Sequence, residues 1–161
     1  MANEIEVHLC RVEDIDKTLK QLWLALALEM FEVEHYTMPS EANADRWANF
    51  VRESLTGGKS FLLVAKSEGK VVGFAYATIF RDYPLDVAEL IGAINDVYVL
   101  PEFRGKSIGK KLMIECMNKM QAEDVKAVRL IVLSENGSAV KLYQRLGFRI
   151  FRYGMIKPLK H

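Results

Sequence analysis

The sequence has few cysteines, no long apolar run and almost no net charge, and each shortage excludes a class of protein. Its two cysteines, Cys10 and Cys116, lie in apolar-periodic segments and lack the Cys and His neighbours of a zinc site, so we expect free, buried thiols and no metal. The longest apolar run, Leu22 to Leu28, is about a third of the roughly 20 residues that a spanning helix needs. We therefore expect no transmembrane helix.

Charge gives this chain little attraction to polyanions. It has 22 Lys and Arg against 21 Asp and Glu, a formal net charge of +1, so we expect neither nucleic acid nor an anionic membrane as a partner. The first ten residues, MANEIEVHLC, are acidic where a secretory signal is positively charged, and no apolar stretch of signal length follows. The sequence therefore predicts a cytoplasmic protein.

The length of 161 residues, half of them apolar, suits one domain, and we expect a single domain over residues 1–161. No repeat or linker divides the chain. In chain order, the sequence predicts a strand at 5–11, helices at 13–35 and 41–55, strands at 60–66, 71–80 and 89–100, a helix at 108–123, a strand at 125–133, a helix at 137–146 and a strand at 148–157. This β-α-α-β-β-β-α-β-α-β order predicts an α/β domain with a mixed sheet, in which a helical crossover makes at least one strand pair parallel.

The most specific stretch joins the end of the strand predicted at 89–100 to the next helix. It reads VYVLPEFRGKSIGKKL, from Val97 to Leu112. Unsatisfied N–H groups at a helix N-terminus, beside small residues such as Gly105 and Ser107, form an anion site, and three lysines add positive charge. The alternative is an ordinary basic helix start exposed to solvent. A Walker A loop is excluded, because Leu100 stands where that motif needs Gly.

A second stretch, NGSAVKLYQRLGF, runs from Asn136 to Phe148. Asn136 is a suitable N-cap for the predicted helix, and Gly147 is suitable for its end. Ala139 and Tyr143 are four residues apart and share one helical face, so a ligand lying over the small residue would end at the phenol. The alternative role for a helical Tyr is packing.

Together, these two stretches resemble the signatures of the GNAT superfamily of N-acetyltransferases. The family's diphosphate motif, Arg/Gln-x-x-Gly-x-Gly/Ala, corresponds to residues 104–109, and its later motif, Asn-x-x-Ala-x-x-x-Tyr-x-x-x-Gly-Phe, corresponds to residues 136–148. Residues 71–75, VVGFA, resemble the family's third strand. The resemblance covers nearly the whole chain. It implies transfer of an acetyl group from acetyl-CoA to a primary amine in a ternary complex, a sheet splayed between its fourth and fifth strands, and a homodimer.

By this resemblance, the amides from Arg104 through Gly109 would bind the diphosphate of acetyl-CoA, and the strand before them would pair with its pantetheine arm. Asn136 would bond the same arm, and Tyr143 would protonate the departing sulfur as the catalytic acid. The candidate cofactor-binding residues are Val97, Tyr98, Val99, Arg104, Gly105, Lys106, Ser107, Ile108, Gly109, Lys110, Asn136, Ala139 and Tyr143.

Ser107 departs from the family pattern, which usually has Gly at this position. Serine is small, and its hydroxyl can itself bond a phosphate. We therefore expect cofactor binding to survive unless this position needs a positive φ, which only glycine adopts at no steric cost.

The reaction also needs a base. A primary amine of lysine type has a pKa near about 10.4, so only roughly one molecule in 2,500 is neutral at pH 7, a cost of about 4.6 kcal/mol before attack. Related enzymes often place a carboxylate on the fourth strand, where the catalytic candidates are Asp96 and Glu89, whereas Asn95 cannot accept the proton. Asp96 would face away from its neighbour Asn95 unless a bulge re-aims it. A water relay, a helix carboxylate and a purely structural Asp96 remain as alternatives.

Acidic and aromatic residues gather near the end of the first predicted helix, which in the family walls the acceptor side. The candidate substrate-binding residues are Glu29, Glu32, His35 and Tyr36, and Glu34, Glu41 and Asp45 lie nearby in the sequence. An acidic wall would favour a cationic acceptor: a polyamine, an amino sugar, an amino acid or a peptide amine. The alternative is an ordinary solvated helix face.

A second function from a different class stays open at this point. A GNAT fold can bind acyl-CoA without turnover, as a sensor or structural partner. Asn95 stands where some relatives have an acidic residue, and together with the uncertain base it keeps this alternative open. Tyr143 favours the enzyme. The sequence does not identify the acceptor, because one fold hosts many substrates, and it does not define the acyl chain length.

Overall fold

The computed structural model describes residues 4–81 and 90–159, and the chain divides into two compact units, Met1–Ile131 and Val132–His161. The first unit is built on a five-stranded sheet in the order β1-β2-β3-β4-β5. Its strands are β1 (Ile5–Leu9), β2 (Ser60–Ser67), β3 (Lys70–Phe80), β4 (Leu90–Val99) and β5 (Val125–Leu130). All neighbouring pairs are antiparallel except β4 and β5, which are parallel. The predicted mixed sheet with one helical crossover is therefore confirmed.

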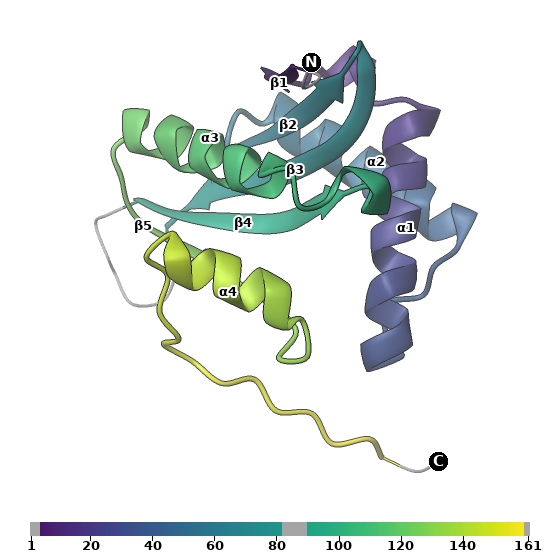
Figure 1. Cartoon of the computed structure of the whole chain (residues 1–161), viewed down its shortest axis with the longest axis vertical. Helices are drawn as coiled ribbons and strands as arrows, with labels where there is room; N and C mark the ends of the chain where they lie inside the picture. Colours follow the sequence, from purple (N-terminus) through teal and green to yellow (C-terminus); the bar gives the residue numbers. More distant parts are fainter. Residues whose placement is uncertain (1–3, 82–89, 160–161) are drawn as a thin grey trace. The chain divides into compact units, whose positions relative to one another are not determined.

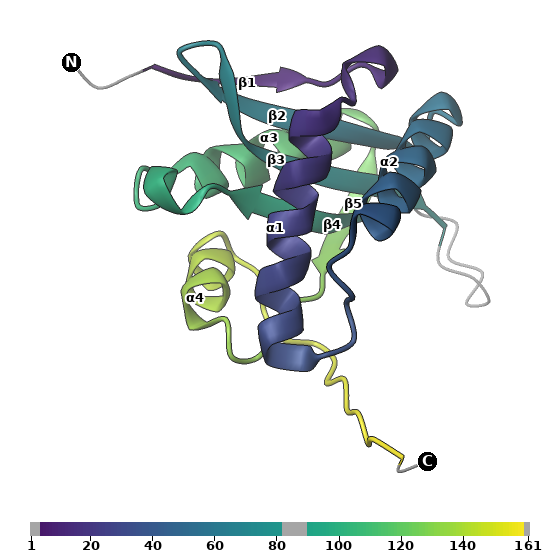
Figure 2. The same cartoon turned by 90° about the vertical axis from the view of Figure 1, so that its right-hand side faces the viewer.

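Helices α1 (Lys17–Glu34) and α2 (Glu41–Thr56) cover one face of the sheet, and α3 (Ile108–Ala122) covers the other (Figure 1 and Figure 2). On the first face, Leu19 and Trp47 pack in one buried cluster with Phe74. On the second face, α3 buries the stripe that contains Leu112 and Cys116. The helix predicted at 108–123 is confirmed, and the sheet packs against a helical layer on each of its two faces.

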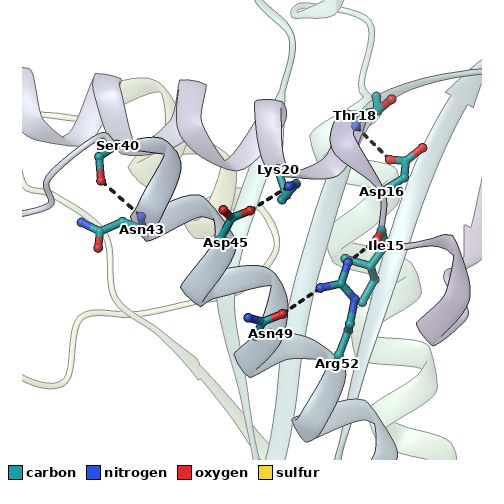
Figure 3. Close-up of polar contacts among 9 residues, drawn as sticks. All are labelled: Ile15, Asp16, Thr18, Lys20, Ser40, Asn43, Asp45, Asn49 and Arg52. Carbon is teal, nitrogen blue, oxygen red and sulfur yellow. Dashed lines mark hydrogen bonds and ion pairs between the residues drawn. The ribbon is translucent and has the colours of Figure 1, made fainter.

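Side-chain caps fix where α1 and α2 begin (Figure 3). Asp16 accepts hydrogen bonds from the backbone N–H groups of Thr18 and Leu19, and Ser40 accepts one from Asn43. Each such cap contributes about 1 kcal/mol to helix stability. The first helix therefore begins at Lys17 rather than at the predicted residue 13, and a single 3₁₀ turn, Val12–Asp14, precedes it.

Two long-range contacts join α2 to α1 and to the segment that leads into it (Figure 3). Lys20 Nζ on α1 lies 2.7 Å from Asp45 Oδ1 on α2. Arg52 on α2 donates from Nη2 to the backbone oxygen of Ile15 at 2.6 Å and from Nη1 to Asn49. The two helices are thereby held as one layer over the sheet.

Both cysteines are free and buried. Burial raises the pKa of Cys10 to about 11 and that of Cys116 to about 12, so neither thiol ionises near neutral pH. The prediction that they pack as small apolar side chains is confirmed.

The second unit contains α4 (Gly137–Arg145), which Asn136 caps through its side chain as predicted. The predicted strand at 148–157 is wrong, because residues 148–158 have no strand assignment and residues 149–159 are exposed. Alternating apolar residues supply strand propensity, but a strand also needs a partner for its backbone hydrogen bonds. Within the described residues, this segment has no such partner.

Candidate active site

The loop between β4 and α3 brings most of the predicted cofactor-binding residues together. A 3₁₀ turn, Pro101–Phe103, follows β4, and Gly105 and Ser107 then adopt φ angles of 76° and 61° before α3 begins at Ile108. The exception stated for Ser107 therefore applies, because its φ is positive, a left-handed conformation that is strained for residues other than glycine. The serine nevertheless adopts this conformation in the structure. The first amides of α3 remain free of helical partners, as at every helix start.

Arg104, from the same loop, lies against α1. Its Nη2 is 2.7 Å from Glu29 Oε1, its Nε donates to the backbone oxygen of Val99 at 2.9 Å, and its guanidinium lies 5.3 Å from the centre of the Tyr98 ring. Tyr98 also donates to Glu29, at 3.3 Å. Burial, followed by the charge of Glu29, raises the pKa of Tyr98. The structure thus pairs a predicted phosphate-binding residue with a predicted substrate-binding residue.

The pairing between β4 and β5 stops before β4 ends. Their pairing runs from Leu90↔Val125 to Ile94↔Leu130, and β4 continues to Val99 beyond the end of β5. Val97 and Val99 therefore lie where β4 has lost its β5 partner, while both still pair with β3. This is the splayed pair that the resemblance implies.

A bulge in β4 decides which way Asp96 faces. Tyr76 pairs with Asp96, but the next residue of β3, Ala77, pairs with Ile94, so Asn95 is an extra residue on β4. Asn95 Nδ2 donates to the hydroxyl of Thr78 at 3.1 Å. Thr78 and Tyr76 share one face of β3, so the bulge turns both Asn95 and Asp96 toward the α1 and α2 layer.

Asp96 is bound there by an indole. Trp47 Nε1 on α2 donates to Asp96 Oδ2 at 3.1 Å. Burial raises the pKa of Asp96, and the hydrogen bond from Trp47 opposes this rise. Trp47 in turn stacks on Trp23 of α1, with ring centres 5.9 Å apart. A desolvated carboxylate held in one orientation has the properties that a general base needs.

The acidic residues of the predicted wall have different partners in the structure. Glu29 bonds Arg104, Glu34 accepts hydrogen bonds from the backbone and hydroxyl of Thr37, and Asp45 pairs with Lys20. Glu32 is exposed, and His35 ends α1 in a left-handed conformation with its ring against Phe31. Glu89, the other predicted base, lies outside the described residues.

Of the four predicted substrate-binding residues, Tyr36 lines a surface hollow. The hollow has a volume of about 420 Å³ and is shared with Trp23, Trp47 and Phe50. Sequence reasoning missed these three residues. The available signal was the pair Trp47 and Phe50, large aromatics three residues apart on α2, which can share one helix face.

In the second unit, the predicted residues lie on and around α4. Asn136 Oδ1 accepts a hydrogen bond from the backbone N–H of Ala139 at 3.2 Å, so this side chain orders the start of the helix. Tyr143 is half-buried and meets Phe148 edge to face, with ring centres 6.1 Å apart. Burial raises the pKa of Tyr143.

The described residues contain neither a cluster of metal ligands nor a membrane-spanning helix. Over residues 4–81 and 90–159, no group of three His, Cys, Asp or Glu side chains is placed to hold a metal ion. In the same part of the chain, no helix is both long and apolar enough to cross a membrane.

Comparison with known proteins agrees with this geometry. Residues 20–148 match the Acetyltransferase (GNAT) family. The mycothiol acetyltransferase of Paenarthrobacter aurescens is 33% identical over 130 residues, which cover 80% of this chain and 39% of that protein. This chain therefore spans about two fifths of the length of that curated relative.

Solved structures agree on the fold. A mutant of the BH1408 protein from Bacillus halodurans superposes with a TM-score of 0.81 at 22% identity, covering 96% of this chain and 99% of that one. The aminoglycoside N-acetyltransferase AAC(6')-Iy in complex with CoA gives a TM-score of 0.72 at 18% identity, covering 100% and 98% of the two chains. By the family match over most of its length and by its fold, this chain belongs to the GNAT acetyltransferase family.

Proposed function

We propose that this protein transfers the acetyl group of acetyl-CoA to a primary amine by direct attack in a ternary complex. The observation that carries the proposal is that the last residues of β4 have no β5 partner and lead through a short loop to the start of α3. A helix N-terminus attracts a diphosphate, and a strand edge without a partner suits an extended, amide-containing arm. Membership of the GNAT family supports the same cofactor.

The residues of the loop suit the proposed cofactor. At Gly105, an added Cβ would meet nothing within 4 Å, so the backbone there is open to a ligand. Lys106 and Lys110 are exposed and add positive charge. Because Glu29 already holds the Arg104 guanidinium, the backbone amides from Gly105 to Lys110 carry most of the diphosphate binding in this proposal.

Bound acetyl-CoA would supply an activated thioester carbonyl. Asp96 would accept the proton that the acceptor ammonium must lose, at a carboxylate oxygen, directly or through one water. Its orientation by Trp47 and its raised pKa support this role. Tyr143 would donate its phenolic proton to the leaving sulfur, since a tyrosine with its ordinary pKa of about 10 already carries this proton at neutral pH.

The assembly and setting of the enzyme are also proposals. We expect one functional domain over residues 1–161 and a cytoplasmic location, as the sequence predicts, and a homodimer, as the resemblance implies. The acceptor is a small-molecule or peptide amine, with no role for nucleic acid or membrane. Light scattering on the purified chain measures the mass in solution, and a monomer at micromolar concentration would contradict the dimer.

The test is thiol release from acetyl-CoA with a panel of polyamines, aminoglycosides, aryl amines, amino acids and peptide N-termini. The panel compares the natural protein with Tyr143→Phe and Asp96→Asn. We expect turnover with at least one amine, a fall in kcat of roughly tenfold to a hundredfold in Tyr143→Phe, and a pH-dependent loss in Asp96→Asn. Tight acetyl-CoA binding without turnover on any amine would refute the enzyme and favour the non-catalytic acyl-CoA-binding module.

A further inference from the structure

A hollow on the α1 and α2 layer is lined by four aromatic side chains, of which Tyr36 and Phe50 are exposed while Trp47 belongs to the buried core cluster. Trp23 comes from α1, Tyr36 from the connection between the helices, and Trp47 and Phe50 from α2. Tyr36 is 53% exposed and Phe50 is 58% exposed, and Met38 at the same hollow is 55% exposed. Large apolar side chains that gather on a surface instead of a core mark a binding site. The volume of about 420 Å³ is that of a small-molecule site.

Charge limits what such a ligand can be. Among the described residues that line the hollow, Arg46 is the only charged one. It is exposed and donates to Asn43 Oδ1 at 2.8 Å. Aromatic rings can attract a cation over their faces, but Trp23 and Trp47 each use one face to stack on the other. A second positive charge on a ligand would therefore be repelled by Arg46, and no carboxylate among the lining residues would offset this repulsion.

One side chain connects this hollow to the proposed chemistry. Trp47 lines the hollow, and its Nε1 donates to Asp96 Oδ2 at 3.1 Å. A ligand in the hollow that touches the small exposed part of Trp47 therefore lies beside the residue that orients the proposed base. This arrangement suits an acceptor with an apolar body in the hollow and its amine directed toward Asp96.

We infer that the hollow binds the body of the acceptor, and that the acceptor is a primary amine attached to an aromatic or aliphatic group with no further positive charge. The inference rests on the proposed function, and it excludes polyamines and polycationic amino sugars as the preferred acceptors. Phe50 and the Trp23–Trp47 stack would hold the body, and Arg46 would discriminate against a second ammonium.

The first experiment measures binding without turnover. The chain has two tryptophans, Trp23 and Trp47, and both line the hollow, so intrinsic fluorescence reports on its occupancy. Phenethylamine and 1,4-diaminobutane offer the same amine head on different bodies. We expect saturable quenching by phenethylamine, a Kd for it raised about tenfold in Phe50→Ala, and a Kd for 1,4-diaminobutane at least about tenfold higher.

The second experiment measures thiol release with the same two amines. We expect Phe50→Ala to raise the KM for phenethylamine about tenfold with little change in kcat, and Arg46→Gln to raise kcat/KM for 1,4-diaminobutane about fivefold. Leu28→Ala is the matched control, because Leu28 is exposed on α1 without lining the hollow, and it should change neither amine's constants.

The outcomes separate the two proposals. Preference for 1,4-diaminobutane or an aminoglycoside, or an unchanged phenethylamine Kd in Phe50→Ala, overturns the assignment of the hollow and leaves the acetyltransferase intact. Quenching that behaves as expected, with no thiol release from any amine, supports the hollow as a site for apolar amines and refutes the enzyme.

Discussion

The hydrogen bond from Trp47 to Asp96 makes a prediction about the pH dependence of the reaction. Trp47→Phe removes the N–H donor and keeps an aromatic ring between Trp23 and Phe74. A hydrogen bond to a charged group contributes about 1.5–3 kcal/mol. Since about 1.4 kcal/mol corresponds to one pH unit, the acid limb of kcat/KM should move upward by about one to two pH units. The shift is upward because the lost bond stabilised the ionised carboxylate.

The assay is thiol release from acetyl-CoA at saturating cofactor, with kcat/KM for the acceptor measured from pH 5 to pH 10. Trp23→Phe is the control, because Trp23 stacks on Trp47 without being the residue that donates to Asp96. Its acid limb should stay where it is in the natural protein. Asp96→Asn should lose activity most at neutral pH and least at high pH, where the amine is already neutral. An unmoved limb in Trp47→Phe, or an equal loss at every pH in Asp96→Asn, would refute Asp96 as the base.

Three further predictions follow from the same region. Asp96→Asn should raise Tm at pH 7 and lose this advantage as the pH is lowered toward about 4. Burial raises the folded pKa of Asp96, so the protonated carboxyl contributes its full stability below the unfolded pKa, and this contribution is lost as the pH rises through the folded pKa. Ser107→Gly should raise the unfolding free energy in urea by about 0.5–1 kcal/mol, because relief of left-handed strain exceeds the entropy cost of glycine; a loss would contradict this. Glu29→Gln should free Arg104 and lower the CoA Kd by calorimetry about two- to fivefold, with little change in stability, since the pair is exposed; weaker binding would contradict it.

Local patterns in the sequence predicted the parts of the fold that local forces determine. The strands predicted at 60–66 and 71–80 leave only residues 67–70 to connect them, and Ser67 pairs with Lys70 across Glu68 and Gly69, both with positive φ. The helical stripe through Cys116 is buried as expected. The prediction of a strand at 148–157 was wrong because strand propensity is a local property, whereas the partner strand must come from elsewhere in the chain. Pairing needs a second strand, which a pattern within one segment cannot specify.

The candidate site was predicted least well where it depends on contacts between distant segments. Both motifs were found, since their residues are close in sequence. The pairing of Glu29 with Arg104 joins residues 75 positions apart, and it changes the expected role of both side chains. The contact of Trp47 with Asp96 spans 49 positions. The spacing of Trp47 and Phe50 indicated a shared helix face, but it could not show whether that face lies at the surface or in the core.

One inserted residue explains why Asp96 was the hardest assignment. In a regular strand, Ile94 and Asp96 would share a face, and since Ile94 pairs with Ala77, that face would be the one opposite Tyr76. The bulge at Asn95 reverses the alternation, so Asp96 pairs with Tyr76 and meets Trp47 on the α1 and α2 layer. Without the bulge, the carboxylate would point toward the α3 side, away from the hollow. The extra residue therefore brings the proposed base, the indole that orients it and the aromatic hollow to the same side of the sheet.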